Sequence, residues 1–196
     1  MQTPSRAEEI LTFWFGEPRD DQTYYEAWHK RWFTTDPHFD QEIRERFLDD
    51  YHRAAARELH QWQETPRSGL ALVVLLDQFP RNMFRGTAQA FATDAYAREV
   101  AKHLVTSALD RDLLPIERSF VYMPFMHSEE IADQQLSVSL FSQLAQERAY
   151  LDSLSFARRH QEIIRQFGRF PHRNATLGRL STPAEITFLQ QPGSSF

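Results

Sequence analysis

The sequence predicts an all-α fold of eight or nine helices in a single domain that spans residues 1–196. Apolar residues recur every three or four positions along most of the chain, which is the helical period. The six glycines fall between these segments or at their edges, where helices end. Residues 70–79 are apolar on all sides, but no second strand-like run is available to pair with them. We therefore interpret this run as a buried helix too.

Four helices are predicted in the first half of the chain. The first begins with a capping box at Ser5 and Glu8, and the second is a short aromatic helix. Asp36-Pro37 supplies an N-cap and a first-turn proline for a long amphipathic helix, which Thr65-Pro66 ends. Residues 70–79 form the fourth. The apolar faces of the first three contain Ala7, Ile10, Leu11, Trp14, Tyr25, Trp28, Trp32, Phe39, Ile43, Phe47, Tyr51, Ala55, Leu59 and Trp62.

Four further helices are predicted in the second half. They begin at Thr87, after Ser128, before Ala157 and after Thr182, and Gly168 ends the third of them. Ser128 is followed by two acids that we expect in the first helical turn, where the helix dipole favours anions. Because the connections are short, we expect the helices to pack as antiparallel hairpins in a bundle or solenoid. The apolar faces contain Ala92, Tyr96, Val100, Leu104, Leu136, Leu140, Leu144, Ala157, His160, Ile164, Phe167, Ile186 and Leu189.

Composition excludes several classes of function. The formal net charge of −5 argues against a general nucleic-acid binder. The absence of cysteine excludes thiol nucleophiles, disulfides and iron–sulfur clusters, and the scattered glycines exclude phosphate-binding loops. The longest strongly apolar run, Leu70 to Leu76, is too short to cross a bilayer, and the N-terminus does not resemble a signal peptide. We expect a cytoplasmic protein with no cofactor and no membrane partner.

Two similar strings occur far apart in the chain. They are Phe-Pro-Arg-Asn at residues 79–82 and Phe-Pro-His-Arg-Asn at residues 170–174, and each follows an apolar helical segment. Their separation matches no short repeat period. Two related helix-exit turns are the simpler interpretation, and a common ligand site is the alternative.

These strings and their neighbours resemble a known family. Residues 12–16, 75–87, 90–94, 122–129, 159–164 and 167–174 resemble the bacterial and fungal family called domain of unknown function 924. The resemblance covers nearly the whole chain. It implies a tetratricopeptide-like right-handed superhelix, although the 34-residue repeat consensus is absent. It implies no particular activity.

The matching strings are richer in arginine, histidine and carboxylate than helix packing requires. Residues 158–179 alone contain six arginines and a single acid, Glu162. Arginine binds carboxylate and phosphate groups through two N–H groups at once, so we predict a pocket for an anion. The alternative is that these arginines form ion pairs within the protein. The predicted ligand-binding residues are Asp77, Arg81, Asn82, Arg85, His160, Arg169, Arg173 and Asn174.

Catalysis is the second hypothesis for the same residues. His127 and His172 are candidate general acids or bases with Glu129 or Glu130, for a hydrolase acting on an anionic substrate. His160 lies on the apolar face of its helix, so we expect it to be at least half buried. The pattern Glu26-Ala-Trp-His29 occurs only once, and no tight pair of histidines supports zinc, so no metal site is predicted.

The sequence leaves three functions open. The first is a module that binds an anionic small molecule or acidic peptide, the second is the hydrolase, and the third is a self-associating scaffold, which would be a homodimer in its simplest form. The third rests on the aromatics crowded into residues 13–39, which could also pack the short helices together.

Overall fold

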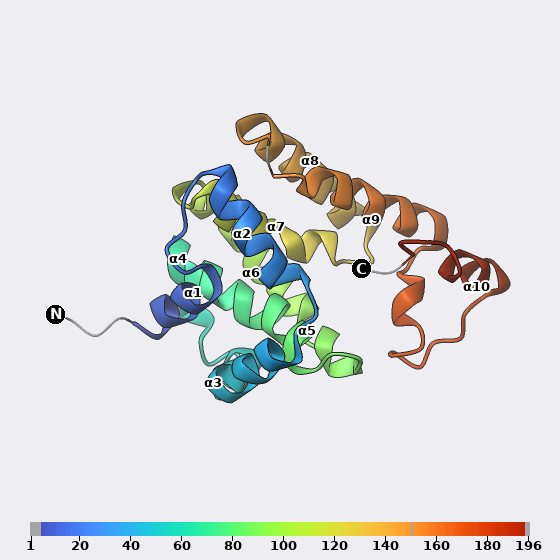
Figure 1. Ribbon diagram of the computed structural model, residues 1–196, viewed down its shortest axis with the longest axis horizontal. Coiled ribbons are helices and arrows are strands. Elements are labelled where there is room, and N and C mark those ends of the chain that lie inside the picture. The colour runs from blue at the N-terminus through green and yellow to red at the C-terminus, as the bar shows by residue number, and fades with distance from the viewer. Residues whose placement is uncertain (1–4, 150, 195–196) are drawn as a thin grey trace.

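The computed structural model describes residues 5–149 and 151–194, and in these residues every regular element is helical (Figure 1). The all-α fold is therefore confirmed. The α-helices are α1 (Arg6–Phe15), α2 (Gln22–Phe33), α3 (Pro37–Ala55), α4 (Pro66–Val73), α5 (Phe79–Met83), α6 (Asp94–Thr106), α7 (Pro115–Met126), α8 (Ile131–Glu147), α9 (Ser153–Phe167) and α10 (Pro183–Leu189). Short 3₁₀ turns are η1 (His60–Glu64), η3 (Ala88–Phe91), η4 (Leu109–Asp112) and η5 (Pro171–Arg173), and η2 (Val74–Gln78) is a π-helical segment.

The helices pack around α4 and α7. Helix α4 contacts α1, α6 and α7, while α3 packs on α5. Helices α8 and α9 lie side by side along one edge of the molecule, and α10 lies beyond the end of α9 (Figure 1). One large apolar cluster extends from α1 to the start of α9, and a small second cluster of Ile163, Ile164 and Phe170 lies beneath the C-terminal segment. None of the helices in the described residues has both the length and the apolar character needed to span a membrane.

The predicted buried helix over residues 70–79 is present and longer than expected. Helix α4, η2 and α5 follow one another without a break, and the side chains of Leu70 to Leu76 have no solvent exposure. In η2 the N–H of Phe79 donates to the carbonyl of Val74, five residues back. Pro80 has no N–H to offer, and the hydroxyl of Thr93 donates to the carbonyl of Leu76 at 2.6 Å. The first Phe-Pro string thus lies inside a helical segment, which corrects its interpretation as a helix exit.

The long third helix ends earlier than predicted. Helix α3 stops at Ala55, and Arg57 adopts a left-handed conformation with φ of 63°. The N–H of Glu58 then closes a turn on the carbonyl of Arg53 at 2.9 Å. Pro66, which we expected to end this helix, instead occupies the first turn of α4, where its fixed φ and missing N–H are tolerated.

Helix α7 is the element that the sequence analysis missed. It is buried on almost every side and therefore has no apolar face that alternates with a polar one. It also contains Pro124, which is unfavourable inside a helix. As a consequence His127 caps the C-terminal end of α7 rather than beginning a helix, and both Glu129 and Glu130 precede the first turn of α8.

Several predicted helix ends are confirmed. The side chains of Ser5 and Asp36 accept backbone N–H groups at the starts of α1 and α3. The predicted helix start after Thr182 is also present, where Thr182 and Glu185 form a capping box with bonds of 3.3 and 2.7 Å. Gly168 ends α9 with φ of 69°, a conformation that other residues adopt at a cost.

Candidate functional site

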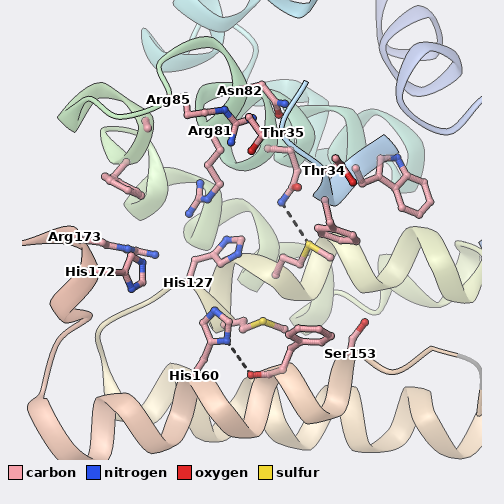
Figure 2. A pocket seen from close by; sticks show the side chains of 18 of the residues that line it. Thr34, Thr35, Arg81, Asn82, Arg85, His127, Ser153, His160, His172 and Arg173 are labelled. Atoms are coloured by element: carbon pink, nitrogen blue, oxygen red, sulfur yellow. Dashed lines mark hydrogen bonds between the residues drawn. The ribbon is translucent and has the colours of Figure 1, made fainter. Parts of the chain in front are cut away.

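A cavity of about 550 Å³ lies between five segments of the chain. Helix α2 and the turn after it form one side, and η2 and α5 form another. The end of α7, helix α9 and η5 complete the walls. Figure 2 shows His127 between Arg81 and His160, with His172 and Arg173 facing them from η5. The cavity thus has one end that is rich in arginine and histidine.

Asp77 and His127 form a hydrogen-bonded pair at this polar end. Nδ1 of His127 lies 2.8 Å from Oδ1 of Asp77, whose side chain is completely buried. The amide of Gln78 donates to the other oxygen, Oδ2, at 2.5 Å. Burial alone would raise the pKa of Asp77, but the charge of Arg81 and the bond to His127 outweigh it and hold this pKa below its usual range. Asp77 is therefore ionised, and its carboxylate fixes the imidazole ring.

Arg81 and Arg173 share a single acid, Asp94, at the first residue of α6. Arg81 donates to its two carboxylate oxygens at 3.0 and 3.1 Å, while Arg173 approaches Oδ2 at 3.5 Å. The guanidinium of Arg173 also lies 4.6 Å from the ring centres of Phe91 and Phe170. Its Nε is buried and has no hydrogen-bond partner among the described residues. Burial and the charge of Arg81 lower the pKa of Arg173 to about 10, which still leaves it protonated near neutral pH.

His160 and His172 are held in the neutral form. Burial, followed by the proximity of His127, lowers the pKa of His160 to about 3, and Nδ1 of this ring lies 2.8 Å from the carbonyl of Phe156. Burial and the charge of Arg173 lower the pKa of His172 to about 4. His160 is 5% exposed, in agreement with the burial expected from its place on the helix. Neutral imidazoles can donate or accept a hydrogen bond at the cavity wall.

The remainder of the cavity is apolar. Two aromatic side chains of this wall, Phe33 and Phe156, are 51% and 46% exposed, so they lie at the rim. Inside them the wall consists mainly of Trp32, Met123 and Met126. Methionine and aromatic side chains adapt to apolar groups of varied shape. The cavity is therefore amphipathic, with charge at one end and hydrocarbon at the other.

Seven of the predicted site residues line this cavity and four do not. Asp77 lies behind His127 and reaches the cavity only through it. Three others, Glu129, Arg169 and Asn174, lie outside the cavity, where they hold the C-terminal segment. The residues that line it are Arg81, Asn82, Arg85, His127, His160, His172 and Arg173.

The residues outside the cavity position η5. Arg179 donates to both oxygens of Glu129 at 2.7 and 2.9 Å, and the N–H of Phe170 donates to the same carboxylate at 2.8 Å. Arg169 forms a similar two-bond pair with Glu185. Arg169 and Arg179 therefore form ion pairs within the protein, which was the alternative to anion binding.

The sequence analysis missed Asp94 and the apolar walls. Asp94 belongs to a string that resembles the family, but nothing in the local pattern distinguishes it from an ordinary first-turn acid. The methionines of α7 lay in the helix that was not predicted. In the described residues, no group of three or more histidine and acidic side chains is arranged to hold a metal ion.

The chain is similar to known proteins over nearly its whole length. The family model described as "Bacterial protein of unknown function (DUF924)" matches residues 10–193. The chain belongs to this family. A protein of unknown function from Agrobacterium tumefaciens, ATU0120, has a solved structure that is similar with a TM-score of 0.82 and 41% sequence identity. The similarity covers 94% of this chain and 96% of that one, so the family fold extends over almost all of both. No curated protein matches the chain.

Proposed function

We propose that this member of the family binds a small organic acid in the cavity. The acid's carboxylate would lie against Arg173 and Arg81, and its hydrocarbon part would lie along the methionine and aromatic wall. A volume of about 550 Å³ falls in the range that small-molecule sites occupy.

The state of Arg173 is the observation that carries this proposal. Its side chain is only 9% exposed, its one ion pair with Asp94 is long, and its Nε lacks a partner among the described residues. The enclosed Nε does not itself reach the cavity, so a bound carboxylate would accept from the terminal N–H groups of this guanidinium, which Asp94 approaches only at 3.5 Å. Asp94 faces both arginines, and the other acid beside Arg81, Asp77, is already bonded to His127 and Gln78, so a further anion is electrostatically favourable at Arg173.

The apolar rim supports a ligand that also carries hydrocarbon. Phe33 and Phe156 are exposed beside the cavity, and an aliphatic or aromatic group passing between them would remove their surface from water. A simple inorganic anion would leave this wall unused. We therefore favour an amphipathic acid over phosphate or sulfate.

The structure gives less support to the hydrolase that uses Glu129 or Glu130 and to the self-associating scaffold. Glu129 is bound to Arg179 away from the cavity, and Glu130 precedes α8, so neither acid is available beside His127. The aromatics of residues 13–39 that suggested self-association are largely interior, as the burial of Trp14 and Phe15 illustrates, and the exposed one, Phe33, lies at the rim of the cavity.

The test uses straight-chain carboxylates from butanoate to decanoate as probes, with octan-1-ol as the neutral match for octanoate. We expect the longer acids to raise the melting temperature, and calorimetry to detect their binding, while the alcohol binds much more weakly. Arg173→Gln should abolish the shift, whereas Arg165→Gln, which changes an exposed arginine on α9, should retain it.

Two outcomes would overturn the proposal. One is the absence of binding for every carboxylate in the series. The other is equal binding of octanoate by the wild type and a folded Arg173→Gln variant. If that variant fails to fold, Phe156→Ser at the rim serves instead, and it should weaken decanoate more than butanoate.

A further inference from the structure

The Asp77–His127 pair is more elaborate than a binding site requires. Both oxygens of a fully buried carboxylate are occupied, one by Nδ1 of His127 at 2.8 Å and the other by the amide of Gln78 at 2.5 Å. Arg81 lies 3.4 Å from the same carboxylate and keeps it ionised. An ionised carboxylate can only accept a hydrogen bond, so Nδ1 of His127 must carry the hydrogen. This contact therefore fixes the tautomer of the ring.

Nε2 of His127 is consequently the free nitrogen of the ring. His127 lines the cavity with 16% of its side chain exposed, and none of the hydrogen bonds in the described residues engages Nε2. Burial lowers the pKa of His127, and Arg81 adds to this effect while Asp77 opposes it. The imidazole is neutral at physiological pH, with the lone pair of Nε2 directed to the space where the ligand would lie. A carboxylate that fixes and supports an imidazole in this way is the arrangement of a general base.

We infer that the cavity is an esterase site in which His127 is the general base and Asp77 its positioning residue. The substrate class is a carboxylic ester of an apolar acid, and the organic acid of the proposed function is its product. The inference therefore rests on that function. Arg81 and Arg173 are placed beside His127 at the same end of the cavity, where they would receive the carbonyl oxygen of the ester (Figure 2).

Water is the nucleophile in this reaction. The hydroxyl groups in the wall come from Tyr25, Thr34, Thr35 and Ser153. None of the hydrogen bonds of His127 in the described residues involves them. Nε2 of His127 removes a proton from water as the water oxygen bonds to the ester carbonyl carbon. The carbonyl π electrons move to its oxygen, and this oxyanion is stabilised by the two guanidinium groups.

Collapse of the intermediate completes the reaction. The carbonyl re-forms, the bond from carbon to the alcohol oxygen breaks, and its electron pair stays on that oxygen. The oxygen takes the proton from Nε2, which returns His127 to its neutral form. Ester and water thus give an acid and an alcohol, and the acid ionises against Arg81 and Arg173. Its carboxylate then occupies the position assigned to the ligand.

The experiment measures hydrolysis of p-nitrophenyl octanoate by the full chain, together with release of octanoate from methyl octanoate, which has a poor leaving group. We expect His127→Gln to lose about 10²-fold or more in kcat. His38→Gln, which changes an exposed histidine in the first turn of α3, should leave it unchanged and controls for surface imidazoles. Octanoate should inhibit competitively.

Asp77→Asn provides the readout for positioning. It should lower kcat with little change in KM, and it should alter the pH profile, because an amide no longer fixes one tautomer of His127. In the wild type, we expect the rate to be constant above about pH 7 and to fall on the acid side as His127 becomes protonated. A variant that only disturbed folding would lower the active fraction and leave the shape of the profile unchanged.

The outcomes separate this inference from the proposed function. If octanoate binds but neither ester is hydrolysed above the rate in buffer, the esterase is refuted and the binding function stands. Equal hydrolysis by wild type and folded His127→Gln would also refute it. If no carboxylate binds and no ester is hydrolysed, both fail. Hydrolysis that requires His127 and Asp77 and is inhibited by octanoate supports both.

Discussion

Arg81 and Arg173 both direct their guanidinium groups at the carboxylate of Asp94. Arg81 binds it with two N–H groups at 3.0 and 3.1 Å, whereas Arg173 approaches at 3.5 Å. The two arginines belong to the two Phe-Pro strings of the sequence, one in α5 and the other in η5. The strings therefore converge on one acid at the wall of one cavity. This is the geometry expected of a common ligand site, which the sequence had left as the less favoured interpretation.

Removal of the shared acid should have opposite effects on stability and binding. Asp94→Asn removes the anion of Arg173 and one of the two anions beside Arg81, so we expect the free energy of unfolding to fall by about 1–3 kcal/mol. The same change leaves the arginines more positive and should bind octanoate several-fold more tightly. Asp133→Asn, which removes a partner of Arg98 outside the cavity, is the control and should not change the affinity. Weaker binding by Asp94→Asn would argue against carboxylate recognition at this position.

Stability should decrease as the pH falls below the ordinary histidine range. The pKa values of His160 and His172 are lowered from 6.5 to about 3 and about 4 by burial. As the pH drops through about 6.5, the unfolded chain takes up protons that the folded chain excludes, so the unfolded state is favoured. Urea unfolding at a series of pH values should show this decrease between about pH 6.5 and 4. His160→Gln should make stability depend less steeply on pH. If the slope of stability against pH is the same as in the wild type, His160 does not have the lowered pKa.

The Glu129–Arg179 pair should control the order of the segment that carries His172 and Arg173. Glu129→Gln removes the charge that Arg179 neutralises and weakens the acceptor of the Phe170 N–H. Because both side chains are partly exposed, the loss of stability should be modest, about 1 kcal/mol. Hydrogen exchange of the Phe170 amide should accelerate selectively, while the amides of α3 remain protected. Uniform acceleration throughout the protein would indicate a global effect instead.

The hydroxyl of Thr93 should contribute more to the free energy of unfolding than the hydroxyl of an exposed threonine with a similar hydrogen bond. Thr93 donates to the carbonyl of Leu76 in the buried segment that contains Pro80, at 2.6 Å. Thr106 donates to the carbonyl of Lys102 at 2.8 Å on the surface. Thr93→Val should cost about 1–3 kcal/mol, because it leaves a buried carbonyl without a donor, and Thr106→Val should be nearly neutral. Denaturant unfolding of the two variants measures the difference, and equal costs would contradict this role of Thr93.

The sequence predicted well what depends on local periodicity and local hydrogen bonds. Asp36-Pro37 and Thr182 mark helix starts because their caps involve residues within three positions. It failed at α7, since a helix surrounded by protein has no amphipathic period and Pro124 disguises it further. It also placed the end of α3 too late, because the left-handed turn at Arg57 has no glycine or proline to signal it.

For the candidate site, the sequence by itself determined the residue types and the strings in which they occur. Arginine and histidine in the Phe-Pro strings, with His127 and His160, were identified without any distance. Only the tertiary structure decided which of them meet, since ion pairing depends on separations in space that are unrelated to separations along the chain. It directed Glu129, Arg169 and Asn174 to the C-terminal segment, put Asp77 behind His127, and brought Asp94 between two arginines. The cavity itself has no signature in the sequence, because it is the space that helices and turns from five segments leave when they pack.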